Sequence, residues 1–316
     1  MVRDGKSRSV LQVIVISRSY SGPLEAAHNP EVGGLAGFEH ADPSRQDMTL
    51  LCAVYLDLPL PYQAYLFATI NYNQKKVNKS LAYMLFGFDV EDSPPDSWSP
   101  EKAAVLICRK LNVTDKSPFY KHIIVAAQDS ELLFPDKSTS TDWRVSTAAV
   151  VEGILSLISS NPKRDRDIMN SITLKGGRSR KLLDPKGPPL RSLYLECNDV
   201  AIFTAVNSFF AAASGLFWTH ASSNSYIRKT VGIQALFDVL KKVLESFTQD
   251  RNLRVEYFRH ILSDAKDIDF ANDFFQASGK GRSRIRNIIL LAIRRLQTSD
   301  LPQTDDIATY NALLNR

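Results

Sequence analysis

The part of the chain from residue 198 to residue 316 is a succession of segments with helical periodicity. In each segment, apolar residues recur three or four positions apart, which places them on one face of an α-helix. Four such segments follow one another: DVAIFTAVNSFFAAAS, NSYIRKTVGIQALFDVLKKVLESFT, VEYFRHILSDA and RSRIRNIILLAIRRLQ. Because each helix must bury its apolar face against another element, we expect a helical domain at residues 198–316.

The preceding part of the chain mixes strand-like and helix-like segments. The runs SVLQVIVIS and TLLCAVYLDL are apolar, β-branched and of strand length, so they predict two strands. Ser99-Pro100-Glu101 is typical of a helix start. The other expected elements are helices at 62–71, 79–88 and 146–159, and a strand at 122–128. The sequence therefore predicts an α/β (α+β) chain in three parts, at residues 1–90, 91–197 and 198–316.

Size and charge narrow the functional classes. With 316 residues and 44% hydrophobic content, the chain can bury one large core or two modest ones. Its net charge of +5 is a mild basic excess, compatible with a polyanionic partner. The three cysteines and five histidines lack metal-ligand spacing, so we expect reduced thiols and no metal site. Neither a long apolar run nor a signal peptide is present, which predicts a cytoplasmic protein without a membrane partner.

A dense polar block follows an apolar segment in FATINYNQKKVNKS. Its side-chain amides offer hydrogen-bond donors and acceptors, and its lysines offer positive charge, beside backbone groups left unpaired at a helix end. This combination suits a phosphate, a nucleotide or a nucleic-acid backbone. The candidate anion- or nucleotide-binding residues are Asn71, Gln74, Lys75 and Lys76. The alternative interpretation is that the asparagines cap helices and the lysines are solvated.

The basic, glycine-containing stretch LKGGRSRKLLDPKGPP, residues 174–189, interrupts the helical pattern. We expect a mobile surface loop there. Arg178, Arg180 and Lys181 are its candidate contacts to a DNA backbone, made without reading the base sequence. A loop whose cations are simply solvated is the alternative.

A second basic stretch, SGKGRSRIR at residues 278–286, places Lys280 and Arg282 before an amphipathic helix. Free N–H groups at the helix start, together with these cations, favour a phosphate or a nucleic-acid backbone. The stretch lacks the G-x-x-x-x-G-K-[ST] spacing of a P-loop, so it does not predict an ATPase of that class. The alternative is again a flexible basic turn.

The segment LFATINYNQKKVNKSLAYMLFG closely resembles a stretch of the DGQHR-domain family. In that family, F-x-x-I-N-x-x-Q-x-x-V leads into a helix. Here those slots are filled by Phe67, Ile70, Asn71, Gln74 and Val77. Three later segments are similar to family segments in the same order: LNVTDKSPFYKHIIV, NSYIRKTVGIQALFDVL and FFQASGKGRSRIRNI.

The resemblance, which runs from about residue 35 to residue 296, implies a fold and a role. The family includes the DndB-type proteins of DNA phosphorothioate modification and belongs with ParB- and sulfiredoxin-like folds. This implies an incomplete ParB-like unit at residues 1–90, a mixed α/β extension at 91–197 and a helical domain after it. The implied role is in bacterial DNA modification or defence, through DNA binding or regulation.

One departure from the family is at residues 30–34, which read Pro-Glu-Val-Gly-Gly where the family has its D-G-Q-H-R motif. The arginine and histidine missing there are the implied phosphate clamp and acid/base group. We therefore expect an N-terminus that is truncated or altered relative to the family. Catalysis that relies on the motif is in doubt for this chain.

Three functional hypotheses follow. The first is a DndB-like protein that binds DNA weakly to moderately, with DNA-modification proteins or a second copy of the chain as further partners. The alternative is a nucleotide-hydrolysing, ATPase-type enzyme of the ParB-like superfamily. Its cofactor would be a nucleotide such as ATP. Because the motif is missing, we expect no ATP hydrolysis above background. The third is an interaction scaffold without either activity. Whether the chain is an enzyme stays open.

Overall fold

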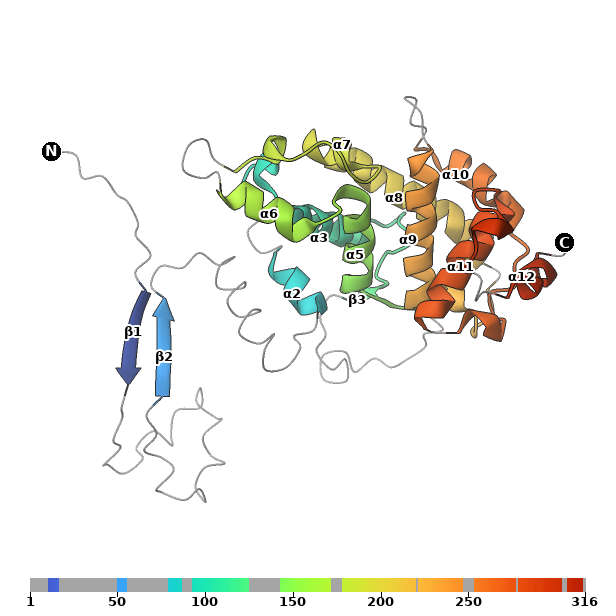
Figure 1. Cartoon of the computed structure of the whole chain (residues 1–316), viewed down its shortest axis with the longest axis horizontal. Coiled ribbons are helices and arrows are strands. Elements are labelled where there is room, and N and C mark those ends of the chain that lie inside the picture. Colours follow the sequence, from blue (N-terminus) through green and yellow to red (C-terminus); the bar gives the residue numbers. More distant parts are fainter. Residues whose placement is uncertain are drawn as a thin grey trace, which may run out of the picture. The chain divides into compact units, whose positions relative to one another are not determined.

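The computed structural model divides the chain into two compact units, residues 1–63 and 64–316. Elements are labelled in Figure 1. The structure describes residues 11–16, 50–55, 79–86, 93–124, 143–171, 178–219, 221–246, 253–276, 278–302 and 306–314. The candidate residues Asn71, Gln74, Lys75 and Lys76 lie outside these ranges.

The described residues of the first unit form an antiparallel pair of strands, β1 (Leu11–Ile16) and β2 (Leu50–Tyr55). Their register pairs Leu11 with Tyr55 and Ile16 with Leu50. Both strands were predicted from their apolar, β-branched runs, and both are confirmed. The ParB-like α/β unit implied by the resemblance needs more elements than this pair, so it stays a prediction.

The second unit is mostly helical in its described residues (Figure 1). The helices are α2 (Lys79–Leu85), α3 (Pro100–Val113), α5 (Thr147–Ile158), α6 (Pro162–Ser171), α7 (Arg191–Leu195), α8 (Asp199–Ala213), α9 (Thr230–Glu245), α10 (Val255–Leu262), α11 (Gly279–Ala292) and α12 (Ile307–Leu313). Two short parallel strands, β3 (Ile123–Ile124) and β4 (Val145–Ser146), form its small sheet. The expected α/β character of residues 91–197 is thus limited, in the described residues, to two residues in each strand.

Local sequence signals explain where the helices begin. The Ser99 hydroxyl accepts a hydrogen bond from the Lys102 backbone N–H at 3.3 Å, and Pro100 occupies the first helical position of α3. The Ser146 hydroxyl accepts one from the Ala149 N–H, also at 3.3 Å, at the start of α5. Both helix starts were predicted from the sequence, and the structure confirms them.

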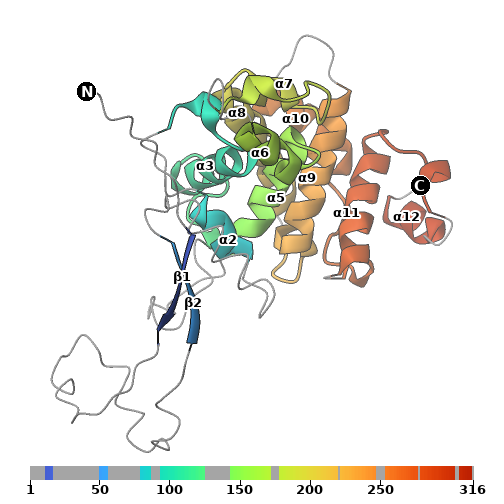
Figure 2. The ribbon, with the colours of Figure 1, turned by 60° about the vertical axis from the view of Figure 1, so that its left-hand side comes forward.

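The core of the second unit lies where α3, α5, α8 and α9 pack on one another. Figure 2 shows α5, α9 and α11 following one another side by side. Phe210 of α8 packs its ring against Phe119 and against Phe237 of α9, with ring centroids 4.7 Å apart in each case. One core thus joins helices from both sides of residue 198, so the expected boundary between 91–197 and 198–316 falls inside a single compact unit.

The stretch Asp199–Trp218, which is α8 and the π-helical turn after it, has the length and hydropathy of a membrane span, with a mean hydropathy of 1.7. Its side chains Phe209, Phe210 and Ala213 are fully buried. Its neighbours include α3, α7, α9 and α10. The apolar composition therefore matches what the central helix of a helical core requires.

Candidate nucleic-acid interface

Four exposed cations lie on two neighbouring segments at one end of the second unit. Lys163 and Arg164 are in the first turn of α6, and Lys181 and Lys186 are in the segment that leads to α7. The 3₁₀ turn at Arg180–Leu182 packs against both α6 and α7. None of the four cations forms an ion pair with another described residue. We call this set of four residues the basic edge.

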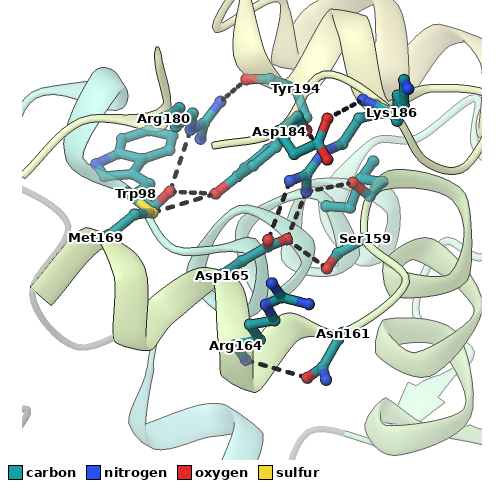
Figure 3. A network of polar contacts seen from close by, with 12 residues as sticks. Trp98, Ser159, Asn161, Arg164, Asp165, Met169, Arg180, Asp184, Lys186 and Tyr194 are labelled. Carbon is teal, nitrogen blue, oxygen red and sulfur yellow. Dashed lines mark hydrogen bonds and ion pairs between the residues drawn. The ribbon is translucent and has the colours of Figure 1, made fainter. Parts of the chain in front are cut away.

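A buried ion pair joins the two segments of the basic edge (Figure 3). Arg191, at the start of α7, donates from both terminal nitrogens to the two carboxylate oxygens of Asp165 on α6; the Nη2–Oδ1 distance is 3.0 Å. Its Nε donates to the Asp184 carbonyl at 3.0 Å, and the Ser159 hydroxyl donates to Asp165 at 2.6 Å. Asp165 adjoins Arg164, and Asp184 is two residues from Lys186, so this contact fixes the backbone under both halves of the edge.

Arg180, a predicted DNA contact, is inside the protein. Its side chain is 0% exposed and lies against the Tyr194 ring, 4.3 Å from the ring centroid. Its Nε donates to the Trp98 carbonyl at 3.1 Å, and its Nη1 donates to the Tyr194 carbonyl at 3.0 Å and to Asp199 at 2.9 Å. The prediction for this residue is wrong, because the buried guanidinium joins the chain before α3 to α7, as Figure 3 shows, and also contacts Asp199 of α8.

The other predicted DNA contacts lie in two places. Lys181 is exposed and belongs to the basic edge, whereas Arg178 is half-buried and close enough to Glu101 to act on its charge. Lys280 and Arg282 lie within the first turn of α11, which begins at Gly279, one turn earlier than expected. Lys280 is exposed, and Arg282 donates to both carboxylate oxygens of Asp238 on α9, at 2.7 and 2.8 Å.

The expected mobile loop at residues 174–189 is, from Arg178 onward, a packed segment. Arg180, Leu183 and Pro188 are buried within it. The exposed lysines Lys181 and Lys186 therefore stand on a backbone held in place by its neighbours.

Lys163 and Arg164 were not foreseen as candidates from the sequence. The signal was present, because Asn161-Pro162 is a typical helix start, and the Asn161 side chain accepts a hydrogen bond from the Arg164 N–H at 3.0 Å. Cations in the first turn of a helix oppose its dipole, so they contribute less to helix stability than acids would at the same positions. Their placement there favours binding of an anion instead.

An open hollow of about 510 Å³ lies next to the basic edge. It is lined by Ser160, Gly187, Pro188, Pro189, Lys241, Leu244 and Glu245. Ser160 comes shortly before Lys163, and Gly187 directly follows Lys186, so the hollow adjoins both halves of the edge. In the part of the chain that is described, no three His, Cys, Asp or Glu side chains gather as metal ligands would.

The helix that follows the polar block is attached to the helical core. This helix, α2, was predicted at residues 79–88 and is observed at Lys79–Leu85. Its Lys79 pairs with Glu152 of α5 at 2.8 Å, and its Ser80 hydroxyl accepts a hydrogen bond from the Ala148 N–H at 3.1 Å. The family-like segment therefore leads directly into the unit that carries the basic edge.

A buried carboxylate, Glu101, was not foreseen beyond its place at a helix start. It is 4% exposed, and its Oε1 accepts a hydrogen bond from Arg166 of α6 at 2.5 Å. Its Oε2 is buried without a hydrogen-bond partner. Burial raises the pKa of Glu101, an effect that Arg166 and, to a smaller degree, Arg178 oppose.

This raised pKa predicts a pH dependence of stability. Above a pH of about 4.5, where the unfolded chain loses the Glu101 proton, the native state still binds it, so the free energy of unfolding falls as pH rises towards the native pKa. We expect Glu101→Gln to remove this fall, so that the variant gains stability relative to the parent as pH increases. Urea unfolding at a series of pH values measures it. Glu256→Gln, at an exposed position on α10, is the control. Identical pH profiles for parent and Glu101→Gln would contradict the prediction.

No protein-family model, curated protein or solved structure matches this chain. The resemblance to the DGQHR-domain family therefore stays a prediction from the sequence.

Proposed function

We propose that this chain binds the phosphate backbone of DNA through its basic edge, as a DGQHR-domain, DndB-like protein of bacterial DNA modification or defence. The observation that carries the proposal is the basic edge itself. It consists of exposed cations from two segments, none of which forms an ion pair with another described residue, and a buried ion pair joins the two segments. The family part of the proposal rests on the sequence segments that resemble the DGQHR domain.

The chemistry of the basic edge fits a repeating phosphate chain. Lysine and arginine side chains bind phosphate oxygens by charge-assisted hydrogen bonds, and such contacts position a protein on DNA without reading the base sequence. Lys163 and Arg164 also lie in the first turn of α6, where the helix dipole favours negative charge. The net charge of +5 also favours association with a polyanion.

The fixed backbone under the edge improves binding. Cations on a mobile loop lose conformational freedom when they bind, and that loss reduces affinity. Here Arg191 and Asp165 set the positions of both segments before any ligand arrives. The conformational freedom that is still lost on binding is that of the side chains alone.

The binding must depend strongly on salt, which provides the test. Each phosphate neutralised on duplex DNA contributes about −0.9 to the slope of log K against log salt. We expect the triple variant Lys163→Gln/Arg164→Gln/Lys186→Gln to bind more weakly and to make that slope less steep by up to about 2.7. Fluorescence polarisation with a labelled duplex, at several salt concentrations, measures both quantities.

The matched control removes the same number and kind of charges elsewhere. Lys116, Arg259 and Lys266 are exposed and lie on other segments. Their triple glutamine variant should keep the parent slope. Equal losses of affinity in the two triple variants would show that only net charge matters, and would contradict the basic edge as the site. An absence of duplex binding at low salt would contradict the proposed binding of duplex DNA.

A further inference from the structure

A stacked pair of rings, His122 and Trp143, lies on another part of the second unit. Their ring centroids are 4.4 Å apart and their planes differ by only 9°. Both side chains are half-buried, so part of the pair is exposed. The His122 Nδ1–H donates to the Trp143 carbonyl at 2.9 Å, which fixes the ring orientation.

The fold brings these two rings together from distant positions in the sequence. His122 directly precedes β3, and Trp143 lies two residues before β4. The strands pair in parallel, and the Val145 N–H donates to the His122 carbonyl at 3.0 Å. The stack is therefore built on a sheet contact, not on a free loop.

The turn before β3 has a constrained backbone. Lys121 has φ = 60°, a left-handed conformation that is uncommon for a residue with a side chain. Asn112 holds this turn at two points, because its carbonyl accepts from the Lys121 N–H and its side chain accepts from the Ile123 N–H, both at 3.0 Å. Residues in sparsely populated conformations occur often at binding sites.

Aromatic residues support the stack from inside. The Trp143 ring meets Trp218 edge-on with centroids 4.7 Å apart, and it meets Phe119 at 6.0 Å. Phe119 is fully buried and Trp218 is 6% exposed. The Trp143 ring is thus backed by the core, and His122 covers a face of it.

An exposed cation is adjacent in the sequence to each residue of the stack. Lys121 directly precedes His122, with its Nζ 4.8 Å from the Tyr120 ring centroid, and Arg144 directly follows Trp143. Neither cation forms an ion pair with another described residue. A stacking surface between two cations is the arrangement that binds single-stranded nucleic acid, where a base stacks and the adjoining phosphates meet the positive charges.

We propose that the His122–Trp143 pair is a stacking site for an unpaired nucleobase, with Lys121 and Arg144 contacting the adjoining phosphates. The base would stack on the His122 ring and extend the stack on that side. Because every nucleobase has an aromatic face, we expect little preference among bases. A duplex, whose bases are already stacked, offers nothing to this site. The inference goes beyond the duplex contacts of the basic edge and does not require them.

The test separates bases from phosphates. Two labelled single-stranded oligonucleotides of equal length, oligothymidylate and its fully abasic counterpart, carry the same backbone charge. We expect the parent protein to bind oligothymidylate about tenfold more tightly than the abasic strand. His122→Leu, which keeps the Trp143 face covered but removes the flat ring, should bring that ratio close to one, and His122→Phe, which keeps a flat ring, should preserve it. His260→Leu, at an exposed histidine on α10, is the matched control and should keep the parent ratio.

The outcomes are distinct for the two proposals. The triple glutamine variant of the basic edge should weaken binding of both strands and leave their ratio unchanged. A parent ratio near one, or a ratio unaffected by His122→Leu in a protein with the parent melting temperature, overturns the stacking site and does not contradict the basic edge. Binding of oligothymidylate without any duplex or abasic binding overturns the basic edge and supports the stacking site. An absence of binding to any of these strands overturns both.

Discussion

Asp165→Ala lowers the free energy of unfolding by about 3–5 kcal/mol, because it leaves the Arg191 guanidinium buried without its charged partner. Arg191 is 4% exposed and directs both terminal nitrogens at Asp165. The Ser159 hydroxyl loses its acceptor as well. Urea unfolding at neutral pH measures the change as a shift of the midpoint at constant m-value.

Two further variants test the cause of this loss. Asp167→Ala removes an exposed carboxylate from the same helix and should change stability by no more than about 0.5 kcal/mol. Asp165→Leu/Arg191→Met removes both charges and should recover much of the stability, since paired buried charges can be replaced by packed apolar groups. A loss below about 1 kcal/mol in Asp165→Ala would show that the ion pair does not hold the segment.

Local sequence signals were sufficient to predict several of the helix starts. Ser99 and Ser146 cap their helices as expected, because a cap needs only its own side chain and a backbone N–H three residues later. The long helices after residue 198 follow from their apolar spacing alone. Helix α6 was missed because its composition is polar and its apolar face is narrow.

Burial of charged side chains was not predictable in the same way. The run GGRSRK is typical of a solvated basic loop, yet its Arg180 is fully buried while the neighbouring Lys181 is exposed. Arg180 donates to the Trp98 carbonyl, 82 residues earlier in the chain. It also donates to the Tyr194 carbonyl and the Asp199 carboxylate, 14 and 19 residues later. A single sequence carries no record of such distant partners. The His122–Trp143 stack escaped notice for the same reason, since its residues are 21 positions apart.

The sequence predicts that GKG, at the start of α11, is part of a phosphate-binding turn. The structure distinguishes its two glycines. A Cβ atom on Gly279 would meet nothing within 4 Å, whereas one on Gly281 would lie 1.7 Å from the Gln276 carbonyl oxygen and 2.9 Å from the Phe275 carbonyl oxygen. Gly281 also donates its backbone N–H to the Ser278 cap at 3.2 Å. The preceding chain thus crosses α11 so closely at Gly281 that a side chain has no room there.

Gly281→Ala should therefore destabilise the protein by about 1–3 kcal/mol or more, because the obstructing atoms belong to the backbone and cannot rotate away. Gly279→Ala is the matched control. It adds the same methyl group two residues earlier in the same helix, in open space, and alanine's higher helix propensity should leave stability unchanged or raise it by up to about 1 kcal/mol. Thermal and urea unfolding of the two variants, with duplex-binding assays on both, separate packing from ligand binding. If Gly281→Ala melts like the parent but loses affinity for DNA, the close crossing is not structural and the glycine serves the phosphate contact first predicted from the sequence.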